Sequence, residues 1–272
     1  MMSASSPIGV FDSGLGGLTA LRRLRREMPH EDFIYFGDTA RIPYGGRDRE
    51  TLMRFARGDI AFLQQFGVKA VLVACGTISS VLLEQIRGDY AIPLAGVIES
   101  AAAAAARATQ NGRIGVWGTA ASIASGAYAR KLGALGYEQT VCLPCPKLVP
   151  LIESGHTGAD DPQVREAVRE YLEPVCAFGA DTLILGCTHY PLLEEAIRAG
   201  TQRALRLIDS GGESASLLLE TLRAQGLLRA QGTGKTRYFV SGRAEEFIRI
   251  GGRFLGEDLA GKVEQADAES FG

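Results

Sequence analysis

The strongest constraint on the fold is a regular alternation between short apolar segments and longer amphipathic ones. Residues 8–11, 33–36 and 70–73 are runs of β-branched and aromatic side chains, which are typical of buried strands. Residues 18–28 and 49–66 carry apolar side chains at helical spacing. This strand–turn–helix order predicts an α/β protein, with a largely parallel sheet and helices on both of its faces.

The second half of the chain resembles the first. Residues 8–13 are similar to 114–119, and residues 67–75 are similar to 179–187, in the same order and at a similar separation. Any two α/β strands look somewhat alike, but the matched order favours a duplicated unit. We therefore predict two pseudo-symmetric, doubly wound domains with mainly parallel sheets, and an active site in the cleft between them.

The tail of the chain decides how the two domains are divided. No linker rich in Ser or Pro separates the repeats. Residues 214–225 have a helical pattern and residues 237–240 a strand pattern, so we expect the tail to return and complete the first domain. The predicted first domain is residues 1–96 plus 208–272, and the second is residues 97–207.

Each repeat ends a buried strand with a cysteine, Cys75 in the first copy and Cys187 in the second, and the residues that follow can open a helix. The amino end of a helix carries unpaired N–H groups, which lower the pKa of a thiol from its ordinary value of ~8.5 towards neutrality, where proton transfer is efficient. Taken alone, either cysteine fits a buried structural role equally well. Their equivalent positions in two repeats indicate a facing acid–base pair.

Polar residues gather at the same strand ends, where parallel sheets bind their ligands. A lone histidine is more often structural, but His189 follows Cys187 and Thr188 at a strand end, and Pro191 fits the first turn of a helix. Asp12 and Ser13 follow the first strand. The other candidates at these ends are Gly14, Gly16 and Gly17, which permit close approach to a ligand, and Asp38, Thr39, Pro43, Tyr44, Gly45, Thr119 and Ser122.

The composition excludes several classes of function. The chain has 29 Lys and Arg against 31 Asp and Glu, a net charge of −2, so it has no general attraction for nucleic acid or anionic lipid. The arginines at positions 22, 23, 25 and 26 are interpreted as the solvated face of a helix. No run approaches the ~18 apolar residues of a membrane span, and residues 1–7 lack the apolar stretch of a secretion signal. We expect a cytoplasmic protein that binds neither nucleic acid nor membrane.

Three short motifs do not support other chemistry. The glycine-rich segment 14–19 ends in Thr19, where a dinucleotide fingerprint needs a small residue. Residues 234–236 resemble the end of a phosphate-binding loop, but Arg229 stands at the earlier glycine position and a strand follows. Cys142 and Cys145 lack a second Cys/His pair at metal spacing, so we interpret them as structural and expect no metal site. The total of five cysteines is odd, which argues against a disulfide framework.

Three spaced motifs, at residues 8–19, 35–45 and 186–193, resemble those of the glutamate racemases in the aspartate/glutamate racemase family. The resemblance runs from Ile8 to about Ala244, and the three motifs stand in the right order, which makes it specific. It implies two pseudo-symmetric α/β domains with the substrate buried between them. It also implies racemisation of L-glutamate to D-glutamate without a cofactor, in the service of peptidoglycan biosynthesis, cell-wall biogenesis and cell shape.

The resemblance implies a role for each candidate residue. Cys75 and Cys187 would stand on opposite faces of the substrate α-carbon, one removing a proton and the other returning one. Asp12, near Cys75, and Glu153 and His189, near Cys187, would assist the thiols. No metal, pyridoxal or nucleotide is expected. The substrate would be held by Asp12, Ser13, Pro43, Tyr44, Gly45, Gly76, Thr77, Thr119, Ser122, Thr188 and His189.

Two positions depart from the pattern of the family. Gly76 stands where Asn is usual between Cys75 and Thr77, and a lost hydrogen bond to a charged group costs ~1.5–3 kcal/mol. Residues 98–100 lack the usual Glu-Pro. Three alternatives stay open: a racemase of another acidic amino acid such as aspartate, a catalytically impaired amino-acid-binding relative, and, from Cys142 and Cys145, a thiol-redox protein. The resemblance also implies a homodimer.

Overall fold

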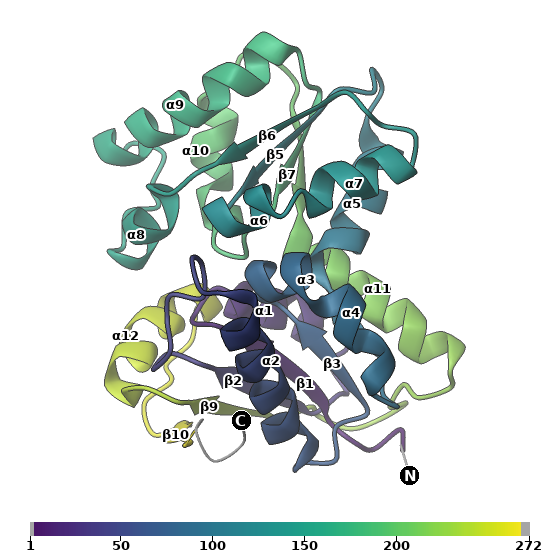
Figure 1. The fold of residues 1–272 in the computed structure, drawn as a ribbon. Helices are drawn as coiled ribbons and strands as arrows, with labels where there is room; N and C mark the ends of the chain where they lie inside the picture. Colours follow the sequence, from purple (N-terminus) through teal and green to yellow (C-terminus); the bar gives the residue numbers. More distant parts are fainter. Residues whose placement is uncertain (1–2, 268–272) are drawn as a thin grey trace.

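The chain forms two parallel sheets, one above the other in Figure 1, each lying between layers of helices. The computed structural model describes residues 3–267, so the ends of the predicted first domain, residues 1–2 and 268–272, lie outside the described part. Within the described part, the larger sheet has six strands in the order β10-β9-β2-β1-β3-β4, and the smaller has four in the order β6-β5-β7-β8. All paired strands are parallel, which confirms the predicted α/β class.

The strands are short, and β1, β2, β3, β5 and β7 are buried at every residue, as is typical of parallel strands covered on both faces. The larger sheet consists of β1 (Ile8–Asp12), β2 (Phe33–Gly37), β3 (Ala70–Val73), β4 (Leu94–Gly96), β9 (Thr236–Val240) and β10 (Val263–Gln265). The smaller sheet consists of β5 (Ile114–Gly118), β6 (Thr140–Pro144), β7 (Thr182–Leu185) and β8 (Arg206–Asp209).

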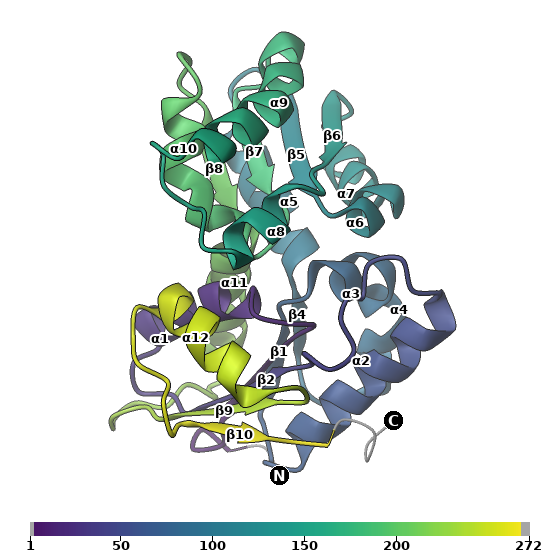
Figure 2. The same cartoon turned by 90° about the vertical axis from the view of Figure 1, so that its left-hand side faces the viewer.

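Helices cover both faces of each sheet, as Figure 2 shows. On the larger sheet, one face carries α1 (Gly17–Glu27), α11 (Ser210–Ala224) and α12 (Ala244–Leu255), and the other carries α2 (Arg49–Gln64), α3 (Gly76–Val81) and α4 (Leu83–Ile86). On the smaller sheet, one face carries α5 (Val97–Ala108), α6 (Ala120–Ala124) and α7 (Ala127–Ala134), and the other carries α8 (Leu148–Glu153), α9 (Pro162–Phe178) and α10 (Glu194–Ala199). Two 3₁₀ turns are η1 (Arg87–Asp89) and η2 (Tyr190–Leu193). No helix within residues 3–267 is long and apolar enough to cross a bilayer.

The internal repeat is visible in the order of the strands. The run β2-β1-β3-β4 in the larger sheet corresponds to β6-β5-β7-β8 in the smaller one. Ile8, the first residue of β1, is in register with the first residues of β2 and β3, and Ile114 of β5 is in register with the first residues of β6 and β7. The tail adds β9 and β10 to the larger sheet alone, beside β2.

The chain crosses between the sheets twice, where β4 leads into α5 and where β8 leads into α11. The predicted boundary between residues 207 and 208 therefore falls inside β8, a strand of the smaller sheet. The two crossing helices pack against each other. Ser214 Oγ donates to the carbonyl of Gly96 at 3.0 Å and lies 2.9 Å from Ser100 Oγ.

Two elements differ from the sequence expectation. The helix predicted at residues 214–225 begins earlier, at Ser210, because the Asp209 carboxylate caps it by accepting the N–H of Gly211 at 3.0 Å. The sequence pattern did not indicate this first turn, because Gly211 and Gly212 have no side chains that could show helical spacing. The turn that contains Pro191 is a 3₁₀ helix that leads into α10.

Candidate active site

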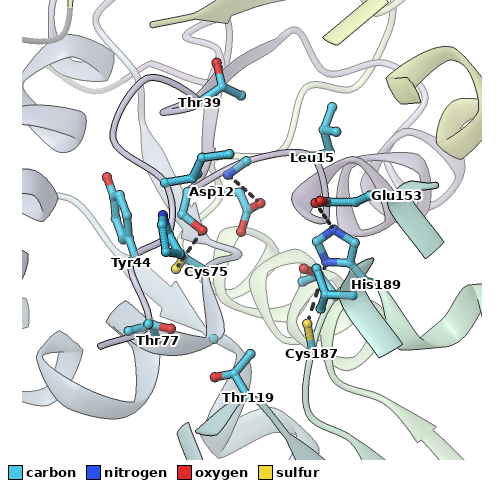
Figure 3. Close-up of a pocket in the computed structure, with 18 of the residues that line it drawn as sticks. Asp12, Leu15, Thr39, Tyr44, Cys75, Thr77, Thr119, Glu153, Cys187 and His189 are labelled. Atoms are coloured by element: carbon cyan, nitrogen blue, oxygen red, sulfur yellow. Dashed lines mark hydrogen bonds and ion pairs between the residues drawn. The ribbon is translucent and has the colours of Figure 1, made fainter. Parts of the chain in front are cut away.

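A cavity of about 640 Å³ lies between the carboxyl ends of the strands of the two sheets. Loops that follow β1, β2, β3 and β9 line it from the larger sheet, and loops that follow β5, β6 and β7 line it from the smaller one. Figure 3 shows Cys75 and Cys187 on opposite sides of this space. The strand ends singled out in the sequence therefore meet in one place.

All but one of the residues to which the resemblance assigns a role line the cavity. Those that do are Asp12, Ser13, Pro43, Tyr44, Gly45, Cys75, Gly76, Thr77, Thr119, Glu153, Cys187, Thr188 and His189. Ser122 is fully buried behind Thr119 and does not line the cavity. It lies in the first turn of α6, where its N–H donates to Thr119 Oγ1 at 3.2 Å and its Oγ accepts from the Thr119 hydroxyl at 2.9 Å. Its contact with a ligand in the cavity would pass through Thr119.

Cys75 lies two residues beyond β3, at the amino end of α3. Its thiol donates to Ser13 Oγ at 3.6 Å, and the nearby Asp12 Oδ2 accepts the N–H of Gly14 at 3.0 Å. Burial, with the negative charge of Asp12 adding to it, raises the pKa of Cys75 to about 12. Burial also raises the pKa of Asp12. The expectation that a helix terminus lowers the thiol pKa is wrong for Cys75, because lost hydration and a neighbouring carboxylate outweigh the short helix.

Cys187 occupies the equivalent place beyond β7, with different neighbours. Its Sγ lies 3.6 Å from Nδ1 of His189, whose Nε2 lies 3.1 Å from Oε1 of Glu153 at the end of α8 (Figure 3). Burial alone would lower the pKa of His189, but the hydrogen bonds with Cys187 and Glu153 outweigh burial and raise it to about 10. His189 is therefore a cation at neutral pH and donates from both ring nitrogens. One thiol thus lies beside a carboxylate and the other beside an imidazolium.

The two halves of the site touch at Gly16, just before α1. A Cβ on Gly16 would lie 2.2 Å from Thr188 Oγ1 and 2.5 Å from His189 Nδ1, so only glycine fits here. The neighbouring Thr19 hydroxyl donates to the carbonyl of Thr188 at 2.7 Å. The close approach expected at Gly16 is therefore an approach to the His189 loop of the other half.

Gly76 faces the smaller sheet. A Cβ at this position would lie 3.2 Å from the carbonyl oxygen of Gly186 and 3.5 Å from Ser122 Oγ. The asparagine that is usual at this position in the family that the chain resembles would therefore have its Cβ in contact with the loop that carries Cys187.

Part of the cavity wall was missed by the sequence reasoning. It comes from the loop after β9 and the start of α12, namely Gly242, Arg243, Glu246, Phe247 and Ile250. The signal was present, because residues 237–240 were predicted as a strand and the next residues repeat the turn-then-helix order that marks a ligand edge. Cys145 also lines the cavity; its thiol is buried and donates to the carbonyl of Leu143 at 3.5 Å.

The cysteines offer neither a disulfide nor a metal cage. All five thiols are free. Among residues 3–267, no group of three or more His, Cys, Asp or Glu side chains is placed to hold a metal ion.

Comparison with known proteins gives a consistent result. Residues 16–218 match the family described as Asp/Glu/hydantoin racemase. The glutamate racemase of Geobacter metallireducens is 44% identical over 97% of this chain and 97% of its own length. A crystal structure of glutamate racemase from Francisella tularensis in complex with D-glutamate has a TM-score of 0.90 and 34% identity, covering 98% of this chain and 100% of that one. Glutamate racemase from Bacillus anthracis has a TM-score of 0.91 and 38% identity, covering 96% and 97%.

Proposed function

The chain belongs to the Asp/Glu/hydantoin racemase family, and from this premise we propose that it is a glutamate racemase, which interconverts L- and D-glutamate without a cofactor. The observation that carries the proposal is the placement of Cys75 and Cys187. They follow equivalent strands of two repeated sheets and stand on opposite sides of one cavity. Inversion at a carbon atom needs a proton acceptor on one face and a proton donor on the other, and two facing thiols supply both.

The reaction is a two-sided proton transfer. A thiolate takes the α-proton from one face of glutamate, and the thiol on the opposite face gives its proton to the resulting carbanion, so that the configuration inverts. The negative charge moves from the carbanion to the second sulfur, and the two cysteines have exchanged protonation states. The His189 imidazolium supplies Cys187 with a hydrogen-bond donor for the stage at which that sulfur is negative. Asp12 beside Cys75 supports the protonated form of that thiol.

The polar wall of the cavity holds the charged groups of the substrate. Within residues 3–267, the backbone N–H groups of Tyr44 and Gly45 have no hydrogen-bond partner, so they are free to receive a carboxylate. Thr77, Thr119 and Thr188 line the same space. Fixed donors in a site that excludes water stabilise the charge that develops in the transition state.

The proposal extends to biological context. D-Glutamate produced by this reaction would supply peptidoglycan biosynthesis, in the cytoplasm, and the enzyme would act as a homodimer. The second candidate function is racemisation of aspartate, which Gly76 favours because the missing side chain removes one contact to the substrate. The same residue favours the third candidate, an amino-acid-binding relative with impaired turnover.

One experiment separates these candidates. Purified protein is incubated with L-glutamate or L-aspartate in D₂O without added cofactor. Circular dichroism follows the loss of the signal of the L-enantiomer, and NMR follows the incorporation of deuterium at the α-carbon. We expect racemisation of glutamate, with deuterium mainly in the product. Glutamate that binds without optical change or exchange would refute the enzymatic proposal, and faster racemisation of aspartate would shift the substrate assignment.

Cysteine variants test the site. Cys75→Ala and Cys187→Ala should each abolish racemisation, because either change removes the proton carrier on one face. Cys142→Ala, in β6 and away from the cavity lining, is the control and should retain activity. Loss of activity in the control alone would contradict the assignment.

A further inference from the structure

Two buried carboxyl groups meet one phenol behind the cavity wall. Asp38, after β2, and Asp59, in α2, both have fully buried side chains. The hydroxyl of Tyr44 lies 2.9 Å from Asp59 Oδ2 and is also hydrogen-bonded to Asp38 Oδ2. The ring of Tyr44 lines the cavity, whereas its hydroxyl points away from the two cysteines towards these acids (Figure 3).

A count of protons shows that this cluster is not made of two carboxylates. A phenol has one hydrogen and can donate it to only one acid; towards the other acid its oxygen can only accept. An ionised carboxylate has no hydrogen to give. Two ionised acids would therefore leave one short contact between oxygen atoms without a hydrogen, in a place where unpaired buried charge is costly.

The count of charges agrees. Arg41 is the cation that bonds to both acids, with Nε 2.5 Å from Asp38 Oδ2 and Nη2 2.8 Å from Asp59 Oδ1. One guanidinium neutralises one carboxylate. If the second acid carries a proton, the buried cluster is neutral.

The hydrogen-bond partners decide which acid is neutral. Asp38 accepts from Tyr44 and Arg41 on Oδ2 and from the Ser241 hydroxyl on Oδ1 at 2.7 Å, as a carboxylate does. Asp59 has fewer donors: Arg41 donates to its Oδ1, and its Oδ2 is in contact only with the phenol oxygen, whose single hydrogen is shared between the two acids. Burial raises the pKa of Asp59 well above its usual range, and the charge of Asp38 adds to that effect.

We propose that Asp59 is a protonated positioning residue: it donates its proton to the Tyr44 oxygen, which in turn donates to Asp38. This relay fixes the tyrosine by both of its hydrogen-bonding functions. Tyr44 and Gly45 line the cavity, and within residues 3–267 their backbone N–H groups have no partner, so the relay holds in place a part of the wall that can receive a substrate carboxylate. This role of Asp59 rests on the proposed racemase function, whereas its protonation does not.

Infrared spectroscopy tests the protonation independently of activity. The difference spectrum between wild type and Asp59→Asn at neutral pH should contain the carbonyl stretch of a protonated carboxylic acid, present in wild type and lost in the variant. If no such band is lost, the proposal is overturned, even for a protein that proves to be an active racemase. If the band is lost from a protein that does not racemise glutamate, only the proposed function fails.

Matched variants test the positioning role. Asparagine mimics a neutral acid, because its oxygen can accept from Arg41 and its N–H₂ can donate to Tyr44. Asp59→Asn should therefore keep kcat/KM for glutamate within about threefold of wild type, whereas Asp59→Leu, of similar size, should raise KM at least tenfold with a smaller change in kcat. Asp38→Asn is the matched control and should be the more damaging amide, because it replaces an ionised acceptor. The proposal would be overturned if Asp59→Asn and Asp59→Leu reduced kcat/KM equally. It would also be overturned if Asp38→Asn kept kcat/KM near the wild-type value while Asp59→Asn did not.

Discussion

Gly16→Ala tests the contact between the two halves of the site. The new Cβ would lie 2.5 Å from Nδ1 of His189, and real Cβ contacts essentially never fall below 3.0 Å. The imidazole must therefore withdraw by about 0.5 Å, from 2.5 to 3.0 Å, and Thr188 Oγ1, at 2.2 Å, must move further. The ring is held 3.6 Å from Cys187 and 3.1 Å from Glu153, so its withdrawal disturbs both hydrogen bonds.

The expected magnitude follows from these displacements. Overpacking of this kind costs about 1–3 kcal/mol of stability, measured by urea unfolding. A displacement of about 1 Å costs roughly a hundredfold in rate, so about 0.5 Å should reduce kcat/KM by about tenfold. The reduction must be equal for L- and D-glutamate, because the equilibrium constant of a racemisation is one.

Isotope exchange locates the damage. In D₂O, the enantiomer whose α-proton faces Cys75 should still exchange that proton for deuterium and keep its configuration. For the other enantiomer, whose α-proton faces Cys187, the rate of exchange should decrease as much as the rate of racemisation. Gly133→Ala, in α7, is the control, since a Cβ there meets nothing within 4 Å. Unchanged racemisation in Gly16→Ala, or an equal loss of exchange from both enantiomers, would refute the reasoning.

Three further predictions concern charge and hydrogen bonding. The pKa of His189 is raised from 6.5 to about 10, so its contribution to stability is fully present below about pH 6.5 and is lost as the pH rises through about 10. Between these pH values, the free energy of unfolding measured with urea should fall more steeply for wild type than for His189→Gln. Gly76→Asn needs a shift of only a few tenths of an ångström against Gly186 and should lower KM for glutamate by about tenfold, as steady-state kinetics would show; an unchanged KM would mean that another group already makes the contact. Lys69→Met removes a buried ammonium that bonds to Glu31 at 2.6 Å, and should cost about 3–5 kcal/mol in the free energy of unfolding; a loss below ~1 kcal/mol would contradict this.

The fold was predictable because the signals for it are local. Parallel strands covered on both faces are continuous apolar runs, so residues 70–73 were recognised with their observed limits. The repeat placed Cys75 and Cys187 at equivalent strand ends, and the strand order bears this arrangement out. The start of α11 was missed because Gly211 and Gly212 carry no periodic side chain.

The electrostatics of the site was not predictable from local pattern. The sequence shows that Cys75 precedes a helix, but the pKa of its thiol is raised by burial and by the charge of Asp12, which lies far away in the chain. The same holds for Asp59, in the middle of a predicted helix, where nothing indicates that it meets Tyr44 and Asp38. The protonation of these groups depends on contacts between residues that are distant in the chain, and local patterns in a single sequence do not indicate such contacts.

The double crossing of the chain determines where the molecule can bend. Both crossings lie on the same side, at Gly96–Val97 and at Asp209–Ser210, and the helices that follow them are fastened together by Ser100 and Ser214. Any widening of the cavity would have to keep these two helices together, and the bond from Thr19 to Thr188 lies beside them, because a Cβ on Gly211, at the start of α11, would lie 3.1 Å from Cβ of Ala20. Because α5 covers the smaller sheet and α11 covers the larger one, this fastening also sets the distance between the strand ends that carry Cys75 and Cys187.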